Sequence, residues 1–395
     1  MWRDPHVWQL ALAALTLVLW LGAAWEVMRG NRRLRRLAAL PLVAPGPAPV
    51  AGPVRWPRVS VVVAARNEGA TLGAAVPTML ALDYPDLEVI VVDDRSEDDT
   101  AAVLEKLAAA DPRLRIEHVR TLPSEWMGKS HALHQGAARA TGDWILFTDA
   151  DIHFAPDCLR RAVTYARGQN IDHLSAMPRL HERGAALGIC VGAFGLCFTL
   201  FVRPWRIPDP RSPCHGGIGA FNLVRAATYR KLDGHRPLRL RPDDDLKLGK
   251  LMKAGGWSEM LIGDGAISVA WYSTVGELVR GLTKNAYAAT DYRAWFVLGG
   301  VAANGLFFLW PVAALAVTTG PALALNAAAV AVMLAVAVDN QRCTGGRWWH
   351  GLFFPAGLLV LDYILLRSMV VTHLTRGITW RGTHYRLRDL KANRL

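Results

Sequence analysis

Residues 87–100 read LEVIVVDDRSEDDT, an apolar run that ends abruptly in a series of carboxylates. A short run rich in Val and Ile is typical of a strand that is covered on both faces of a sheet. Three similar runs occupy residues 59–64, 114–119 and 144–148. Stretches with the helical spacing of Ala and Leu separate them, at residues 71–81, 97–109 and 129–140. This alternation predicts βαβ units, and therefore an α/β fold with a mostly parallel, Rossmann-like sheet.

Acidic residues follow two of these predicted strands and open a later predicted helix. Asp93 stands at the end of the run 87–92, and Asp149 and Asp151 stand at the end of the run 144–148. A third group, Asp243-Asp244-Asp245, begins a helical stretch. Open α/β sheets bind ligands in the crevice beyond the carboxyl ends of their strands. The sequence therefore predicts a ligand site lined by carboxylates.

Different chemistry is expected from each group. Asp93 can accept a hydrogen bond from a uracil imide or a ribose hydroxyl, whereas Asp98 and Asp99 are explained by the start of the next helix. Asp149 and Asp151 lie on the same side of an extended segment because side chains alternate along it. Such oxygen ligands suit Mg²⁺ or Mn²⁺, which complete their coordination with substrate phosphates and water.

Several further residues have two readings from the sequence alone. The turn Arg66-Asn67-Glu68 is either a solvated turn or a loop that contacts a nucleotide. Lys129 is either a phosphate contact or a surface lysine. Among residues 243–245 at least one carboxylate complements the helix dipole, and one is a candidate general base. Residues 216–219, GGIG, lack the context of a dinucleotide-binding fingerprint and indicate flexible backbone close to a substrate.

Composition indicates a membrane protein. Hydrophobic residues make up 52% of the 395 residues, and the formal net charge is +12. The basic residues lie beside apolar runs, which favours a membrane surface over nucleic acid as the partner. Residues 7–27 can span a bilayer, and a basic cluster follows them directly, formed by Arg29, Arg32, Arg33, Arg35 and Arg36. This order predicts an anchor with the rest of the chain on the cytoplasmic face. The five cysteines show no CxxC spacing, so no zinc site is expected.

Four more apolar segments follow. Residues 184–202 interrupt the predicted catalytic region, and an interfacial or buried helix is expected there. Residues 295–317, 322–338 and 352–371 are candidate membrane segments. Three crossings would place the basic tail 376–395 outside, against the positive-inside rule. Either the last segment is re-entrant or interfacial, or the tail is an exception to that rule.

The expected organisation has five parts. These are an anchor at 1–28, a basic and Pro-rich linker at 29–57, a catalytic domain at 58–293, C-terminal membrane segments at 294–375 and a basic tail at 376–395.

The order of the motifs carries a resemblance to a known family. The stretches VVVAARNE (61–68), VVDDRSEDDT (91–100), GKSHALHQGAARATGDWILFTDAD (128–151), GGIGAFNLVRAATYRKLDG (216–234) and DDDLKLGKLMKAGGW (243–257) follow one another. Together they resemble family 2 glycosyltransferases with a GT-A fold. The flanking apolar segments are similar to those of the ceramide glucosyltransferase and hopanoid-associated branch.

The resemblance implies an inverting glycosyltransferase in the plasma membrane. It would move a sugar from a nucleotide-sugar donor, expected to be UDP-linked, to a membrane lipid at the cytoplasmic face. Asp245, twelve residues before Trp257, would be the catalytic base, and Asp151 would bind Mg²⁺ or Mn²⁺. The residues implied for the nucleotide-sugar are Arg66, Asn67, Glu68, Asp93, Lys129, Asp149 and Lys284.

One departure from the family keeps two alternatives open. Processive relatives and ceramide glucosyltransferases carry an Arg-Trp pair, but residues 280–285 read RGLTKN, in which Lys284 is the candidate cation for the leaving diphosphate. A processive polysaccharide synthase and a non-catalytic membrane scaffold are the alternatives. The missing pair and the few C-terminal segments oppose the first, and the intact set of acids opposes the second.

Overall fold

The structure, a computed structural model, describes residues 5–42 and 56–395, which form two compact units. Unit 1 comprises Met1–Arg33, Glu182–Arg203 and Trp271–Leu387. Unit 2 comprises Leu34–His181, Pro204–Ala270 and Arg388–Leu395. These units do not coincide with the sequence boundaries 58–293 and 376–395, because each unit is built from several separate segments. Residues 43–55 of the expected linker lie outside the described residues.

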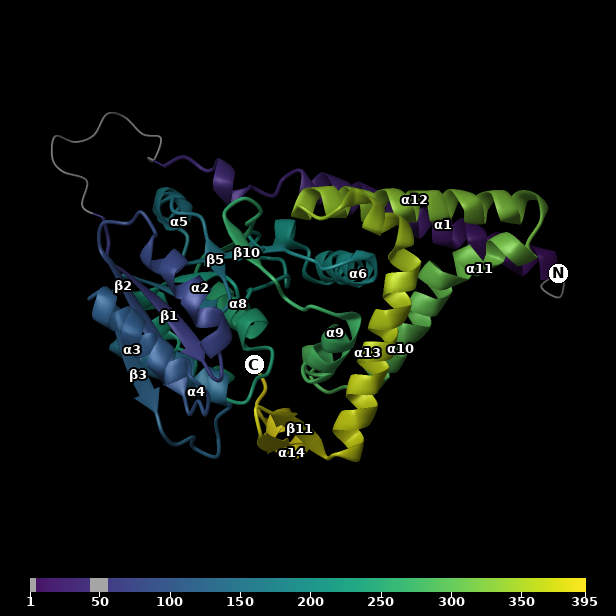
Figure 1. The fold of residues 1–395 in the computed structure, drawn as a ribbon. Helices are drawn as coiled ribbons and strands as arrows, with labels where there is room; N and C mark the ends of the chain where they lie inside the picture. The colour runs from purple at the N-terminus through teal and green to yellow at the C-terminus, as the bar shows by residue number, and fades with distance from the viewer. Residues whose placement is uncertain (1–4, 43–55) are drawn as a thin grey trace. The chain divides into compact units, whose positions relative to one another are not determined.

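Unit 2 is built on a seven-stranded sheet of order β3-β2-β1-β4-β8-β6-β9. Figure 1 labels its strands β1, β2 and β3. Its first four strands are β1 (Val59–Ala65), β2 (Leu87–Asp94), β3 (Leu114–Val119) and β4 (Trp144–Asp149), and they pair in parallel. They match the four predicted strands to within two residues. The Rossmann-like α/β fold is therefore confirmed, with a mixed second half.

Alternate residues of these strands face two separate cores. Val61 and Val63 pack with α2 (Gly69–Leu80), α3 (Thr100–Ala110) and α5 (Cys158–Gly168). Val62 points to the opposite face, where α4 (Gly128–Arg139), α7 (Ala226–Lys231) and α8 (Asp244–Gly255) pack. Because both faces are covered, the strands are apolar at nearly every position. The helices α2, α3 and α4 are the three that the sequence predicts.

The second half of the sheet is short and mixed. Strand β8 (Asn222–Arg225) runs antiparallel to β4 and to β6 (His173–Met177), and β6 pairs in parallel with β9 (Ser258–Ile262). A separate three-stranded sheet joins β5 (His153–Phe154), β10 (Ile267–Val269) and β7 (Arg179–Leu180). Because β8 is antiparallel, the segment that precedes it, residues 216–221, arrives at the carboxyl end of β4. This brings the GGIG stretch beside Asp149.

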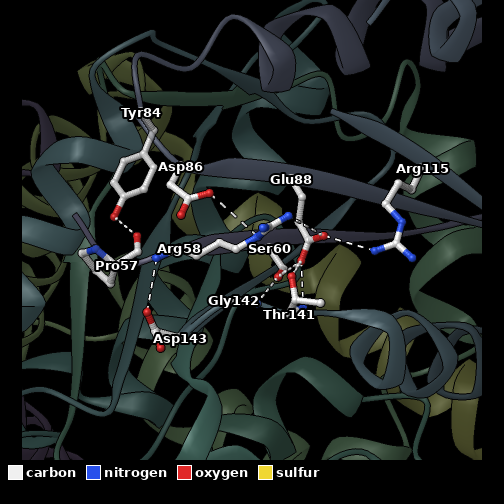
Figure 2. A network of polar contacts seen from close by, with 10 residues as sticks. All are labelled: Pro57, Arg58, Ser60, Tyr84, Asp86, Glu88, Arg115, Thr141, Gly142 and Asp143. Atoms are coloured by element: carbon white, nitrogen blue, oxygen red, sulfur yellow. Dashed lines mark hydrogen bonds and ion pairs between the residues drawn. The ribbon is translucent and has the colours of Figure 1, made fainter. Parts of the chain in front are cut away.

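A buried carboxylate fixes the opposite, amino-terminal edge of the sheet. Glu88 is 2% exposed and accepts hydrogen bonds from the hydroxyl of Ser60 (2.6 Å) and from the backbone N–H and hydroxyl of Thr141 (2.8 Å each). Arg58 and Arg115 each approach its other oxygen to 3.3 Å (Figure 2). Burial would raise the pKa of Glu88, but these hydrogen bonds and the charge of Arg58 hold it below its ordinary value.

Unit 1 consists mainly of apolar helices. Among the residues that the structure describes, five segments are long and apolar enough to cross a membrane, by length and composition. They contain α1 (Pro5–Asn31), α6 (Ala185–Val202), α10 (Ala294–Asn304) with α11 (Trp310–Val317), α12 (Gly320–Thr344) and α13 (Phe354–Leu374). The four segments expected to be membrane segments are among the five, and α6, expected to be interfacial or buried, is the fifth.

Specific contacts hold these helices together within unit 1. Helices α1 and α12 run side by side (Figure 1), and Arg32 pairs with Asp339 at 3.3 Å where both end. The indole of Trp20 donates to the carbonyl of Phe307 at 3.0 Å. Asp362 in α13 accepts a hydrogen bond from the Asn304 amide at 2.7 Å. Asp362, an acid within an apolar segment, therefore has a hydrogen-bond partner. Such a partner lowers the free-energy cost of placing a carboxyl group inside a membrane.

Candidate active site

The carboxyl ends of β1, β2 and β4 lie level with one another. In the strand register Asp93 is the partner of Ala65, and Asp149 is the partner of Ala64. Asp93 and Asp149 therefore flank the end of β1. They lie at the carboxyl ends of parallel strands, which is where ligands bind to open sheets of this kind.

The turns after β1 and β2 are bound to each other. Asn67 has a positive φ of 53°, its N–H donates to the Ser96 hydroxyl at 3.0 Å, and its side-chain oxygen accepts from the N–H of Glu97 at 2.8 Å. The N–H of Glu68 donates to the hydroxyl of Thr100 at 2.8 Å. Arg66 and Glu68 thus lie on a turn whose backbone is fixed beside the end of β2.

Asp93 has local partners that sequence reasoning missed. It is 6% exposed and accepts a hydrogen bond from the N–H of Ser96 at 3.2 Å, and its other oxygen lies 3.1 Å from Nδ1 of His118. Its neighbour Asp94 forms a two-point ion pair with Arg95, at 2.8 and 2.9 Å. The carboxylate of Asp93 therefore also closes the turn after β2, and its contact with a nucleotide stays a prediction.

Lys129 joins two of the three acidic groups. It is the second residue of α4, and its ammonium lies 2.6 Å from Asp149 and 3.9 Å from Asp244. Burial would lower the pKa of Lys129, but the charges of Asp149, Asp244 and Asp245 outweigh this effect and raise it. Lys129 therefore stays charged. The surface reading of this lysine is excluded, because its side chain is held among these carboxylates.

Asp151 lies in a negative and largely dehydrated setting. Burial raises its pKa to about 6, and the charges of Asp149 and Glu68 act in the same direction, while Lys129 opposes them. A cation bound beside Asp149 and Asp151 would relieve this repulsion.

The chemistry of these donors fits a phosphate-bound Mg²⁺ or Mn²⁺. Among the described residues no group of three or more His, Cys, Asp or Glu side chains is gathered to hold a metal ion. Sites that bind a metal together with phosphates need only one or two protein carboxylates, since phosphate oxygens and water complete the shell. Asp149 and Asp151 supply such a pair.

The three acids at the start of α8 have three different environments. Asp243 is buried and forms a two-point ion pair with the buried Arg241, at 2.8 Å for both contacts. Asp244 is 4% exposed, its Oδ2 atom is buried without a hydrogen-bond partner among the described residues, and burial raises its pKa. Asp245 is only partly buried, and burial raises its pKa as well. Asp243 therefore has a structural role, and Asp245 is the acid accessible at the site.

The backbone of one residue, Gly219, connects Asp149 with Asp245. The N–H of Asp149 donates to the carbonyl of Gly219 at 3.1 Å, and the N–H of Gly219 donates to Asp245 at 2.9 Å. A Cβ at residue 219 would collide with the carboxylate of Asp149, and one at residue 217 would collide with the carbonyl of Asp245. Close approach to the carboxylate of Asp149 and to the backbone of Asp245 accounts for Gly219 and Gly217, and the approach of a substrate to this stretch stays a prediction. The GGIG stretch was the signal that could have revealed this contact.

Lys284 belongs to unit 1, whereas the residues described above belong to unit 2. It follows α9 (Val275–Thr283), and its ammonium stands 5.9 Å from the ring centroid of Trp380. Its role at a leaving diphosphate stays a prediction.

Comparison with known proteins identifies one domain of this chain. Residues 60–183 match the family described as glycosyl transferase family 2. They contain Asp93, Lys129, Asp149 and Asp151, whereas Gly219 and Asp245 lie beyond the matched range.

Two characterised relatives align with part of the chain. The beta-monoglucosyldiacylglycerol synthase of a Synechocystis species is 37% identical over 162 residues, which are 38% of this chain and 33% of that protein. The 4,4'-diaponeurosporenoate glycosyltransferase of Staphylococcus aureus is 33% identical over 179 residues, 45% of this chain and 46% of that protein. The aligned segment thus spans a third to a half of each relative.

A solved structure shares the fold over a longer range. The mannosyltransferase PcManGT from Pyrobaculum calidifontis, in complex with GDP-Man and Mn²⁺, superposes with a TM-score of 0.58 and 21% sequence identity. The match covers 93% of this chain and 99% of that one. At this identity the likeness establishes the fold.

Proposed function

We propose, on the premise that the chain belongs to glycosyltransferase family 2 through residues 60–183, that it transfers a sugar from a nucleotide-sugar donor to a membrane lipid. The observation that carries the proposal is that Asp149, Lys129 and Asp245 lie together at the carboxyl end of the sheet. The backbone of Gly219 is hydrogen-bonded to both Asp149 and Asp245. Such a site combines a place for a diphosphate with a base.

The donor lies along the edge formed by β2, β1 and β4. Asp93 and the turn Arg66-Asn67-Glu68 face the nucleoside, and Asp149, Asp151 and Lys129 face the diphosphate. Bound Mg²⁺ or Mn²⁺ would supply positive charge that stabilises the departing nucleoside diphosphate. Lys129 contributes a fixed positive charge at the same place, since its neighbours keep it protonated.

Asp245 acts as the general base for the acceptor. Its carboxylate takes the proton of the acceptor hydroxyl while the hydroxyl oxygen forms a bond to the anomeric carbon. The bond from that carbon to the diphosphate oxygen breaks, and its electron pair leaves with the nucleoside diphosphate. Direct displacement of this kind inverts the anomeric configuration. Burial among acids raises the pKa of Asp245, which strengthens it as a base.

The support for a lipid acceptor comes from the membrane segments and from the relatives. Five segments among the described residues have the length and composition of membrane spans, and the named relatives are a synthase of beta-monoglucosyldiacylglycerol and a glycosyltransferase of 4,4'-diaponeurosporenoate. We place the catalytic unit on the cytoplasmic side of the plasma membrane, because a basic cluster directly follows α1.

Transfer by the purified full-length protein tests the proposal. The protein is incubated in lipid vesicles with radiolabelled UDP-sugars and GDP-sugars and with Mn²⁺ or Mg²⁺, and the lipids are then extracted and identified by mass spectrometry. We expect a lipid that carries one or very few sugars, and loss of transfer in the presence of EDTA and in Asp151→Asn. Long soluble polysaccharide, or near-normal turnover with EDTA present, would contradict the proposal.

A further inference from the structure

The segment Arg388–Leu395 belongs to unit 2 although it follows the last apolar helix of unit 1. Most of it forms the short helix α14 (Leu387–Ala392). Leu390 is 0% exposed, so this segment contributes a side chain to the interior. We call residues 388–395 the tail segment.

The tail segment holds the loop that leads into α8. The side-chain oxygen of Asn393 accepts the N–H of Leu240, and its side-chain N–H donates to the carbonyl of Pro237, both at 2.8 Å. Lys250 of α8 donates to the carbonyl of Leu395 at 2.7 Å. The side-chain amide of Asn393 thus pairs with one backbone N–H and one backbone carbonyl of the loop at the same time. Because the amide is planar, these two bonds fix the orientation of the loop backbone.

The same loop contacts the other side of the site. The carbonyl of Arg239 accepts the N–H of Met127 at 2.7 Å, and Met127 directly precedes α4 and Lys129. Two residues further along the loop, Arg241 pairs with Asp243 at the start of α8. Residues 237–243 therefore connect the start of α4, which carries Lys129, with the start of α8, which carries Asp245.

We propose that the tail segment is a positioning strap for the active site, and that Asn393 is a positioning residue for Asp245 and Lys129. This inference rests on the proposed glycosyltransferase function. Asn393 acts through the backbone of residues 237–240, because its hydrogen bonds end on that loop. A misplacement of about 1 Å at a reacting group can lower turnover by on the order of 10²-fold, so a fixed loop has a large effect on rate.

The test compares Asn393→Ala with Asp389→Asn in the full-length protein. Asp389 lies in α14, which ends directly before Asn393, and its side chain is 50% exposed, so Asp389→Asn is the matched control. Hydrogen exchange is followed in a peptide that contains Leu240, and kcat and donor KM are measured for sugar transfer and for donor hydrolysis. We expect Asn393→Ala to lose protection at Leu240 and to lower kcat by roughly 10-fold, with donor KM nearly unchanged. The control retains both properties.

Hydrogen exchange at Leu240 and the kinetics of sugar transfer distinguish a failure of the strap proposal from a failure of the proposed function. If the wild-type protein transfers no sugar to lipid, the proposed function fails, whereas exchange at Leu240 still reports the strap. Unchanged protection in Asn393→Ala would overturn the inference. Lost protection with full turnover would overturn it as well, and so would full turnover after removal of residues 388–395.

Discussion

Three consecutive aspartates show how strongly side-chain environment decides the role of a residue. Asp243 is bound to Arg241, Asp244 is buried near Lys129, and Asp245 is partly exposed beside Gly219. A buried ion pair that loses one partner leaves an uncompensated charge, so Asp243 is needed for stability. The assignment of Asp245 as the base depends on this division.

Asp245→Asn tests that assignment. We expect turnover to fall by on the order of 10²-fold or more, the typical reach of general base catalysis, because the amide cannot take the acceptor proton. Binding of the nucleoside diphosphate, measured by calorimetry, should persist. Asp243→Asn and Asp244→Asn serve as comparisons. A mild effect in Asp245→Asn together with severe losses in the other two would assign the base elsewhere.

Gly219→Ala tests the hydrogen-bonded link that the backbone of Gly219 forms between Asp149 and Asp245. The φ of Gly219 is not positive, so alanine is compatible with the backbone and its cost comes from the collision with the Asp149 carboxylate. We expect weaker binding of the donor and slower turnover with a small change in melting temperature. Gly73→Ala in α2 is the control, since a Cβ there meets nothing within 4 Å. Normal donor affinity in Gly219→Ala would mean that the link has no role in binding.

The two ends of the first four strands have different roles. The candidate active site lies at their carboxyl ends, and a buried carboxylate that stabilises the sheet lies at their amino ends. Glu88 and its partners stand at the amino end of β1 and β2, opposite the candidate active site. A hydrogen bond to a charged group contributes about 1.5–3 kcal/mol, and Glu88 accepts three at its Oε1 atom.

Glu88→Gln should lower the stability of the protein at neutral pH. The folded pKa of Glu88 lies below its ordinary value, so its contribution is present above the unfolded pKa of about 4.3 and is lost as pH falls through the folded pKa. Thermal unfolding of the full-length protein in detergent at pH 7 and pH 4 measures this. The difference from wild type should shrink at the lower pH, whereas Glu105→Gln on the exposed face of α3 should have little effect at either pH. A constant difference would contradict the assignment.

The first half of the sheet could be predicted from sequence because its strands are covered on both faces and therefore read as apolar runs. Strand β8, residues 222–225, has no such signature, and its antiparallel course depends on pairing with β4 and β6. The residues of the candidate site differ in the same way. The positions of Asp93, Asp149 and Asp151 could be predicted because they follow apolar strands in the sequence. The partners of Asp93 and the position of Gly219 could not, because they depend on contacts between distant segments. No local pattern encodes such contacts.

For the whole molecule, the tail segment constrains the membrane topology. It packs within unit 2, so we infer that it lies on the same side of the membrane as the sheet. An even number of crossings would then separate residues 271 and 387, and at least one of the three C-terminal apolar segments would not cross. Both ends of α6 also continue directly into unit 2, so we infer that α6 enters and leaves on one side.

Labelling of introduced cysteines tests this topology. Lys106→Cys in α3 and Arg394→Cys in the tail segment should resist a membrane-impermeant maleimide in intact cells and react after lysis, since we propose that unit 2, which contains both, faces the cytoplasm. Thr319→Cys, between α11 and α12, should react in intact cells if these segments cross as a hairpin. The unsubstituted chain provides the background from its own cysteines. Reaction of Arg394→Cys without that of Lys106→Cys would contradict the shared side.

The position of the tail segment in the chain also determines when the parts of unit 2 become available during synthesis. A ribosome completes residues 34–270 first and releases residues 388–395 only after the apolar segments 294–374 have been made. Domains generally begin to fold from the amino terminus during synthesis. The sheet can therefore form early, but the loop before α8 receives Asn393 only after the last membrane segment has left the ribosome. Full activity would then arise only in chains whose membrane segments have already been synthesised.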